Sequence, residues 1–324
     1  ALGLAVPVVQ VIASNRLMRR GILLKSATAL ERLAAVDTVV FDKTGTLTLG
    51  RLELCGAVDP DDLRLAASLA ATSRHPLSQA LRRACPAAPA ASGVREHPGA
   101  GLSLAMAEGE VRLGSRTFCG VGAGPEDGMP ELWLARPGHA PRRFAFGDTL
   151  RPGAAEVIAA LERSGKRVAL LSGDRPAAVA AIALALGIAD CRAALAPAQK
   201  HAALAALAAE GRKVLMVGDG LNDAPALAAA FVSMSPASAA DISQAAADVV
   251  FQGLSLGAVL EALDVARASD RVVRQNIGFA IAYNICAVPL AMLGWATPLL
   301  AALAMSSSSL VVVGNALRLR RRGA

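Results

Sequence analysis

A carboxylate stands at the end of an apolar run near the start of the chain. Residues 38–41, Thr-Val-Val-Phe, are β-branched and aromatic, which is typical of a buried strand. The run stops at Asp42, and a loop rich in Thr and Gly follows. Because ligands collect at the carboxyl ends of strands in parallel α/β sheets, we expect Asp42 to lie where chemistry takes place. A carboxylate there can act as a nucleophile, and a loop containing Thr44 and Thr46 can donate hydrogen bonds to a phosphate.

A second loop rich in carboxylates follows another apolar strand, residues 214–217. It reads Gly-Asp-Gly-Leu-Asn-Asp-Ala-Pro and places three acidic or amide side chains within five residues. Such oxygen donors suit Mg²⁺, which takes one or two carboxylates together with waters and phosphate. Asp219 is the best candidate to hold the ion with Asp42, while Asn222 and Asp223 would order the loop and its waters. The alternative is a purely structural Asx-rich turn.

The first loop resembles the phosphorylation motif of the P-type ATPases, D-K-T-G-T-L-T, at all seven positions, and the second matches their G-D-G-x-N-D-x-P. An Asp that merely ends an ordinary strand is the alternative. In the wider haloacid dehalogenase-like superfamily, a second Asp two positions after the nucleophile usually serves as general acid and base. No second Asp is present here, and we expect Lys43 to stand in its place. Losing that base removes assistance to hydrolysis, so an aspartyl-phosphate would last longer, which favours a pump over a phosphatase.

The resemblance also implies roles for residues further along the chain. A strand over residues 168–171 ends at Ser172, the place of the family's T-G-D, where the Ser hydroxyl can bond a phosphoryl oxygen. Lys200 matches the lysine that neutralises phosphate charge, although in isolation it reads as a solvated helix lysine. The residues so implied for catalysis are Asp42, Lys43, Thr44, Thr46, Ser172, Gly173, Asp174, Lys200, Asn222 and Asp223. Those implied for Mg²⁺ are Asp42, Thr44 and Asp219.

Residues 51–143 differ in character from their flanks, being richer in Pro, Gly and Ala. We expect helices around residues 63–69 and up to Arg83, then hairpin strands through Phe118. The P-type ATPases carry their nucleotide-binding domain as an insertion here, with an H-P pair, a P-G-x-G loop and a third glycine. The matching residues, implied to contact ATP, are His75, Pro76, Gly99, Gly101 and Gly114. Taken alone, such pairs are ordinary turns. Many relatives carry a Glu where Ala70 stands, so adenine recognition is either looser or uses another residue.

Two apolar stretches without a charge, residues 277–294 and 297–314, are each of about membrane-spanning length. Arginines cluster beside apolar segments within residues 16–20 and 318–322, as they do at the cytoplasmic flanks of membrane helices. Buried core helices are the alternative. The net charge of +7 could suggest a nucleic-acid partner, but aromatic residues make up only 3% and do not interleave with basic ones, so we expect none. Five scattered cysteines without a C-x-x-C pair fit a reducing cytosol.

Polar residues inside these stretches are candidates for function. The copper-transporting P-type ATPases carry Y-N on one helix and M-x-x-S-S on the next, which this chain matches. A Met thioether is a soft ligand that suits Cu⁺ better than Zn²⁺. The absence of Asp and Lys from both stretches argues against the zinc branch, while simple packing is the alternative for Met305. The residues implied for the transported Cu⁺ are Tyr283, Asn284, Met305 and Ser309.

The resemblance covers the whole chain, and it implies the C-terminal half of a heavy-metal P-type ATPase, nearest to the copper exporters of cytochrome oxidase assembly. In that family the opening Ala-Leu-Gly-Leu-Ala directly follows a Cys-Pro-Cys metal motif, so we expect this chain to lack that motif and the actuator domain, and to bind nucleotide without transporting. The expected division is 1–15, the end of a membrane helix; 16–50, a stalk helix over 16–36 and the first part of the phosphorylation domain; 51–143, the nucleotide-binding domain; 144–270, the rest of the phosphorylation domain; and 271–324, two membrane helices with a basic tail.

The fold class implied is an α/β haloacid dehalogenase-like, Rossmann-like phosphorylation domain with an inserted α+β nucleotide-binding domain and C-terminal transmembrane helices. The function implied is ATP-driven export of Cu⁺ through an aspartyl-phosphate, with ATP and Mg²⁺ as cofactors. Implied partners are membrane lipid and a copper chaperone or periplasmic acceptor. The implied location is a bacterial inner (plasma) membrane, crossed several times, with cytoplasmic catalytic domains. The alternatives are a Zn²⁺ or Cd²⁺ pump, a soluble phosphatase of the superfamily, and a metal-sensing membrane protein without turnover.

Overall fold

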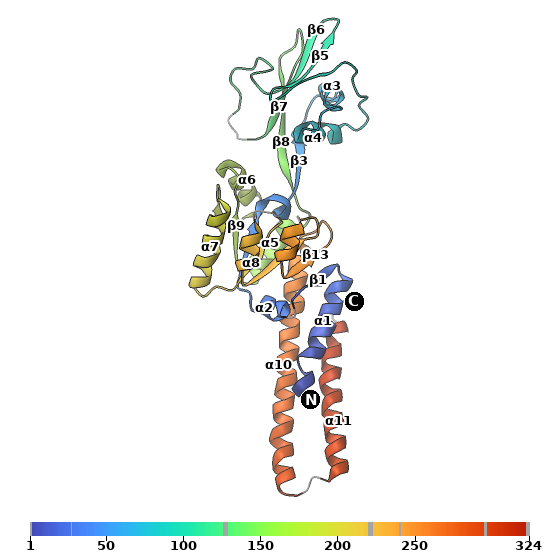
Figure 1. Cartoon of the computed structure of the whole chain (residues 1–324), viewed down its shortest axis with the longest axis vertical. Helices are drawn as coiled ribbons and strands as arrows, with labels where there is room; N and C mark the ends of the chain where they lie inside the picture. Colours follow the sequence, from blue (N-terminus) through green and yellow to red (C-terminus); the bar gives the residue numbers. More distant parts are fainter. Residues whose placement is uncertain are drawn as a thin grey trace. The chain divides into compact units, whose positions relative to one another are not determined.

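The computed structural model describes residues 2–26, 28–125, 129–219, 223–239, 241–294 and 297–321. The chain forms two compact units (Figure 1). The first comprises residues 1–47, 151–174 and 182–324, and the second comprises residues 48–150 with 175–181. The expected nucleotide-binding range, 51–143, falls within the second unit.

The described part of the first unit contains a seven-stranded sheet in the order β1-β13-β12-β11-β2-β9-β10. The strands are β1 (Ile22–Leu24), β2 (Thr38–Asp42), β9 (Arg167–Leu171), β10 (Asp190–Arg192), β11 (Val214–Val217), β12 (Val232–Pro236) and β13 (Val249–Phe251). All pairs are parallel except β1 with β13. Every residue of β2 and β11 is buried, as the continuous apolar runs of central parallel strands require.

Five shorter helices accompany this sheet among the described residues: α2 (Ala29–Ala35), α5 (Ala154–Arg163), α7 (Pro197–Ala209), α8 (Ala224–Ala229) and α9 (Asp241–Ala246). A further helix, α6 (Pro176–Leu186), is divided between the two units after residue 181. One core cluster joins Val40 of β2 and Met216 of β11 to Leu204 and Leu207 of α7 and Leu227 of α8. Alternating strands and helices with a parallel sheet are the expected haloacid dehalogenase-like α/β arrangement, which is therefore confirmed.

The expectation of one helix over residues 16–36 is wrong. Helix α1 (Pro7–Arg19) ends before Gly21, whose φ of +73° is the left-handed conformation that commonly terminates helices. Residues 22–24 then form β1, which pairs antiparallel with β13, and a separate helix, α2, begins at Ala29. The apolar residues that suggested a continuous helix are divided among the end of α1, β1 and α2. Pairing of β1 with the distant β13 overrides the local helical pattern.

The second unit contains a six-stranded antiparallel sheet in the order β3-β8-β7-β6-β5-β4 in the part that the structure describes. Its elements are β3 (Thr48–Cys55), α3 (Pro60–Ala70), α4 (Pro76–Ala84), β4 (Arg95–His97), β5 (Gly101–Met106), β6 (Gly109–Gly114), β7 (Glu131–Ala135) and β8 (Arg142–Leu150). Leu69 of α3 and Leu81 of α4 pack with Leu113, Phe144 and Phe146 of the sheet. This is the expected α+β insertion.

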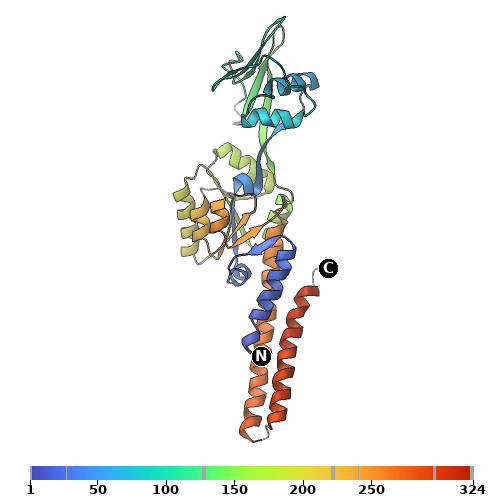
Figure 2. The same cartoon turned by 45° about the vertical axis from the view of Figure 1, so that its right-hand side comes forward.

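Three helices of the first unit pack together, and Figures 1 and 2 both show α1 lying beside α10 (Gly257–Met292) and α11 (Pro298–Arg321). A one-turn 3₁₀ helix, η1 (Leu2–Leu4), precedes α1 and contacts α10 and α11. Helices α10 and α11 are long and apolar enough to cross a membrane. The expected stretches 277–294 and 297–314 fall mainly within them, although α10 begins 20 residues earlier, at Gly257.

Two buried amides connect these three helices. Asn276 of α10 is fully buried, and its Nδ2 donates to the carbonyl oxygens of Ala5 (3.4 Å) and Val312 (3.5 Å). Asn315 of α11 donates from its own Nδ2 to Asn276 Oδ1 at 2.9 Å. In an apolar surrounding such side chains hold helices together, because separating the helices would leave the amides unpaired. The network ties α10 to the segment before α1 and to α11.

Candidate active site

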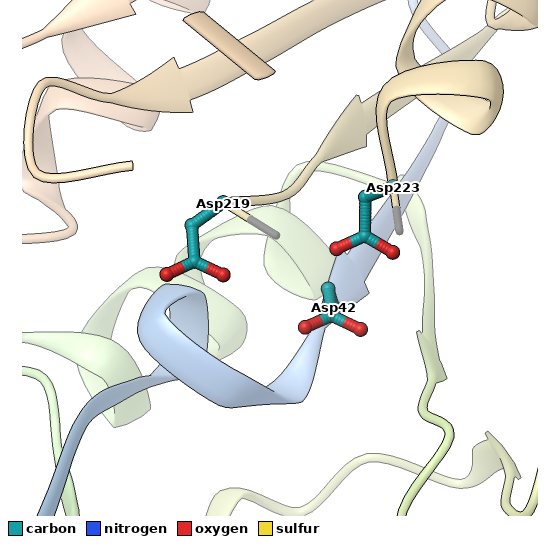
Figure 3. A group of neighbouring side chains, drawn as sticks. All are labelled: Asp42, Asp219 and Asp223. Carbon is teal, nitrogen blue, oxygen red and sulfur yellow. The ribbon is translucent and has the colours of Figure 1, made fainter. Parts of the chain in front are cut away.

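Three carboxylates meet at the carboxyl edge of the central sheet (Figure 3). Asp42 ends β2, and Asp219 and Asp223 follow β11. The two strands are parallel neighbours with Phe41 opposite Val217, so their ends lie at one edge. One oxygen from each carboxylate lies within 4.8 Å of the others. The sequence prediction that the two loops form one site agrees with this arrangement.

Lys200 joins two of these carboxylates. Its Nζ lies 2.5 Å from Asp42 Oδ1 and 2.7 Å from Asp223 Oδ1, and all three side chains are buried. The residue comes from the first turns of α7, on which position 200 faces inward with Ala203 and Leu204. Lys200 is therefore not a solvated helix lysine. A buried ammonium with two acidic partners is well placed to neutralise a phosphoryl group on Asp42.

The carboxylates of this cluster repel one another, which favours the binding of a cation. Burial and the Asp223 charge raise the pKa of Asp42 to about 7, against the opposing effect of Lys200. Burial and the same Asp223 charge raise the pKa of Asp219 to about 6. A cation would relieve this repulsion, since an opposite charge within a few ångströms favours the ionised carboxylate. An all-oxygen donor set of this kind fits Mg²⁺.

The loop after Asp42, labelled η2 (Lys43–Leu47), is shaped by a glycine. Gly45 has φ of +69°, and a Cβ there would lie 1.4 Å from Asp219 Oδ2. Only glycine allows this approach of the loop to the carboxylate. Thr46 is fully buried and its hydroxyl has no hydrogen-bond partner within the described residues. An unpaired buried hydroxyl is costly unless a ligand supplies the partner, so this observation fits the phosphoryl contact implied for Thr46.

Arg151 holds the same loop from behind, and the sequence reasoning missed it. This side chain is 2% exposed, and its guanidinium donates to the carbonyl oxygens of Thr46 (Nε, 2.8 Å) and Gly45. It also reaches the carbonyls of Gly253 and Leu254 at 3.4 Å each. Burial lowers the pKa of Arg151, and the Asp219 charge opposes that effect. An arginine directly before a proline at the re-entry into the first unit was the available signal.

Lys43 does not occupy the position of the missing base. Counting two residues from Asp42 leads to Thr44, so the expectation for Lys43 is wrong. The Lys43 ammonium lies 2.5 Å from Asp174 Oδ2, and the Thr44 hydroxyl is 3.4 Å from the same oxygen. These contacts tie the loop after β2 to the loop after β9. Neither side chain is a carboxylate, so the conclusion that position 44 offers no acidic base is unchanged.

The loop after β9 lies at the same carboxyl edge of the sheet as Asp42, because Asp42 and Leu171, the last residue of β9, are register partners. Ser172 is buried, and its Oγ accepts from the Asp174 amide at 3.2 Å. Its hydroxyl proton can therefore still be donated to a phosphoryl oxygen. Gly173 approaches the Leu195 carbonyl, with an added Cβ 3.2 Å from that oxygen. Asn222 lies outside the described residues.

Three of the five implied nucleotide residues line one pocket of the second unit, about 230 Å³ in volume, whereas Pro76 and Gly114 are not among its described lining residues. His75, Gly99 and Gly101 are among its lining residues. His75 caps α4 by accepting from the Leu77 amide at its Nδ1 (3.3 Å), and Pro76 starts that helix. Gly101 and Gly114 serve strand pairing as well, because an added Cβ at either would lie within 2.3 Å of a backbone oxygen on the other strand or its loop. Gly99, with φ of +75°, has open space in front of it.

The residues implied for copper lie on α10 and α11, outside the buried part of the three-helix contact. Met305 is 64% exposed, Asn284 is exposed, and Tyr283 and Ser309 are half-buried. Among the described residues no hydrogen bond or ion pair joins these four side chains, so the copper assignment stays a prediction. Their exposed apolar neighbours are those expected of helices in a lipid bilayer.

Comparisons with known proteins agree with this geometry. A sequence model of the haloacid dehalogenase-like hydrolases matches residues 36–230. The chain is 50% identical to the nitrogen fixation protein FixI of Rhizobium meliloti (strain 1021), over 99% of this chain and 43% of that protein. It is 40% identical to the probable copper-transporting ATPase SynA of Synechococcus sp. (strain ATCC 27144 / PCC 6301 / SAUG 1402/1), over 99% of this chain and again 43% of the relative. The chain thus spans less than half the length of these relatives.

Among solved structures, the chain is similar to a zinc-transporting PIB-type ATPase in an E2·Pi state. The TM-score is 0.88 and the sequence identity is 31%, over 98% of this chain and 55% of the other. The similarity therefore includes both compact units and the long helices, and it confirms the resemblance to heavy-metal P-type ATPases.

Proposed function

Because the chain belongs to the haloacid dehalogenase-like hydrolase family, we propose that it forms the catalytic part of a P-type ATPase that exports a soft metal ion, Cu⁺, by way of a phosphorylated Asp42. The observation that carries this proposal is the buried set of Asp42, Lys200 and Asp223, with Asp219 beside it. This set lies where β2 ends and the D-K-T-G-T-L-T motif begins. ATP bound in the pocket of the second unit is the phosphoryl donor.

In the phosphorylation step, a carboxylate oxygen of Asp42 bonds to the γ-phosphorus while the bond to the β–γ bridging oxygen breaks, and ADP leaves with that electron pair. The Lys200 ammonium and the hydroxyls of Ser172 and Thr46 bind the phosphoryl oxygens, which is the positioning and charge stabilisation that phosphoryl transfer requires. Asp42, Asp219 and the Thr44 segment are the groups that would hold Mg²⁺, which supplies positive charge to the transferred group. Arg151 keeps the loop carbonyls of Gly45 and Thr46 occupied.

The lifetime of the phosphorylated aspartate distinguishes a pump from a phosphatase. Neither Lys43 nor Thr44 can act as a carboxylate base on an attacking water, and the Lys43 ammonium is engaged by Asp174. Hydrolysis therefore lacks the assistance that a soluble phosphatase of this family would have. The phosphorylated state lasts long enough to drive a change of conformation, and the two apolar helices supply the membrane part that such a change would act on.

Copper is favoured over zinc by the residues of those helices. Over their apolar parts, residues 277–292 and 298–317, neither helix carries an Asp, Glu, Lys or Arg, while Met305 provides a thioether that prefers a soft ion. The relative SynA is a probable copper-transporting ATPase, and it is 40% identical to this chain, against 31% for the zinc-transporting structure. The proposed partners are membrane lipid and a copper chaperone or periplasmic acceptor. The proposed location is a bacterial inner membrane, with the catalytic domains in the cytoplasm.

Asp42→Asn tests the catalytic assignment. The chain, incubated with Mg²⁺ and ATP labelled at the γ-phosphate, should form an acid-stable phosphoenzyme, and the variant should form none, because an amide is not a nucleophile here. Asp241→Asn is the matched control, since this exposed carboxylate of α9 in the first unit lies outside the acidic cluster. Labelling that survives Asp42→Asn would refute the assignment.

The transported metal is tested by the ATPase rate of the full-length protein to which the resemblance assigns this chain. Under reductant, Cu⁺ should stimulate the rate more than Zn²⁺ or Cd²⁺, and Met305→Ala should remove most of that stimulation. Met292→Ala, an exposed methionine at the end of α10, is the control. Stimulation by Zn²⁺ alone would keep the pump and discard copper.

A further inference from the structure

The pocket of the second unit contains two carboxylates, and their surroundings differ. Glu131 is held by two arginines: its Oε1 accepts from Arg116 and its Oε2 accepts from Arg143 Nε at 2.5 Å. Burial raises the pKa of Glu131, but the charged hydrogen bonds from Arg116 and Arg143 outweigh that effect and lower it. Both oxygens of Glu131 are therefore already engaged, and the residue serves as a wall of the pocket.

Glu96 is the second carboxylate, and it remains open to a ligand. It lies in β4, is exposed, and lines the pocket. Its one hydrogen-bond partner among the described residues is the Ser73 hydroxyl, 3.4 Å from Oε1. Ser73 Oγ also accepts from the His75 amide at 3.2 Å, so Glu96 is connected to the turn that carries His75. A carboxylate offers about four lone-pair sites, most of which are free here.

Helix α3 contributes no residue to the described lining of the pocket. Position 70 is an alanine that is completely buried in the core of this unit with Leu69 and Leu81. Beyond Glu96 and Glu131, none of the described residues that line the pocket carries a carboxylate. Among the described lining residues, Glu96 is therefore the carboxylate that still has free acceptor sites for a ligand's amino group.

We propose that Glu96 selects adenine over guanine in this pocket, by accepting a hydrogen bond from the exocyclic amino group of the base. Guanine presents a carbonyl oxygen at the corresponding ring position, which a carboxylate repels. The inference rests on the proposed function, because it assumes that the pocket binds the base of a nucleoside triphosphate. The backbone at Gly99, bare of any side chain and facing open space, leaves room for a flat ring beside Glu96.

The test measures the binding of ATP and of GTP to the full chain in detergent by calorimetry, for the wild type, Glu96→Ala and Glu96→Gln. Glu53→Ala is the matched control, since Glu53 is an exposed glutamate of β3 in the same unit that does not line the pocket. Loss of a hydrogen bond to a charged group should weaken ATP binding about tenfold in Glu96→Ala. GTP binding should be unchanged or tighter, and Glu96→Gln, which keeps an acceptor oxygen, should fall between.

The outcomes separate this inference from the proposed function. A wild type that binds ATP, with the same ratio of ATP to GTP affinity in Glu96→Ala as in Glu53→Ala, would overturn the role of Glu96 and leave the ATPase intact. A wild type that binds neither nucleotide would overturn both. An equal loss of ATP and GTP affinity in Glu96→Ala would also reject the selection of the base, because a structural or purely electrostatic effect does not distinguish the two rings.

Discussion

Asp219 occupies the space that a side chain at position 45 would need. A Cβ on Gly45 would lie 1.4 Å from one carboxylate oxygen of Asp219 and 2.7 Å from the other. The loop after the nucleophile and the loop after β11 are thus fitted to each other through the absence of a side chain. This relationship joins residues that are 174 positions apart and makes the acidic cluster depend on one glycine.

Gly45→Ala should abolish phosphoenzyme formation at Asp42. The added methyl group displaces the Asp219 carboxylate and also strains a backbone with φ of +69°. Gly165→Ala is the control, because Gly165 has φ of +76° with no atom within 4 Å of an added Cβ. The control should show only the cost of the backbone conformation, about 1–2 kcal/mol of stability. Equal labelling by the two variants would contradict the proposed contact.

Lys200→Met should impair both stability and chemistry. The change leaves Asp42 and Asp223 buried without their shared cation, and breaking a buried pair typically costs about 3–5 kcal/mol. Thermal unfolding should therefore occur at a lower temperature, and labelling of Asp42 should fall by at least 100-fold, roughly the effect of losing one preorganised charge. Lys213→Met, at an exposed lysine before β11, is the control. Wild-type labelling in Lys200→Met would refute the role of this ammonium.

Arg151→Met should reduce phosphoenzyme formation without weakening nucleotide binding. The guanidinium binds the carbonyl oxygens of Gly45 and Thr46, and a buried carbonyl left unpaired costs about 1–3 kcal/mol. The loop would lose its fixed geometry. Nucleotide binding should be unaffected, because Arg151 is not among the described residues that line the pocket of the second unit. The measurement is labelling of Asp42 beside calorimetry with ATP. Parallel losses in both assays would indicate general unfolding instead of a positioning role.

Asn276→Leu and Asn315→Leu should destabilise the three-helix contact, and their effects should not add. The two amides share a bond of 2.9 Å, so the second substitution removes less than the first. Hydrogen bonds of this kind between membrane helices are worth about 0.6–2 kcal/mol. Unfolding in detergent of the wild type, both single variants and the double variant gives the coupling energy. A coupling of zero would mean that the bond does not hold α10 to α11.

Much of the catalytic edge follows from short stretches of sequence. Residues 38–48 contain the strand, the candidate nucleophile and its loop in one continuous run, and residues 214–225 contain the second strand and its acidic loop. Local patterns suffice there, because a buried parallel strand must be apolar throughout and must end where the ligand binds. The strand predicted over residues 214–217 coincides with β11, since its apolar run ends at a clear Gly-Asp loop.

Other features depend on residues that are far apart in the chain. Lys200 reads as a solvated helix lysine until α7 brings it to Asp42 at the end of β2. The stretch that re-enters the phosphorylation domain at Arg151 does not by itself indicate that this side chain binds the loop of Gly45. Strand β1 pairs with β13, more than 220 residues away. The residues near β1 alone could therefore not predict a strand in place of the expected helix. Glu96 belongs to the pocket only because β4 lies beside the turn of Ser73 and His75.

The sequence by itself determined the position of the candidate nucleophile, the acidic loop, the fold class and the two apolar helices, because each is encoded by neighbouring residues whose order is enough to define a strand end or a membrane-length helix. Only the tertiary structure decided which charged side chains share the site. The partners of Asp42, the glycine that admits Asp219 and the amides that join α10 to α11 are set by packing between distant segments. Their physical basis is burial, since an ion or amide enclosed away from water must find its partner in whatever part of the chain the fold brings there.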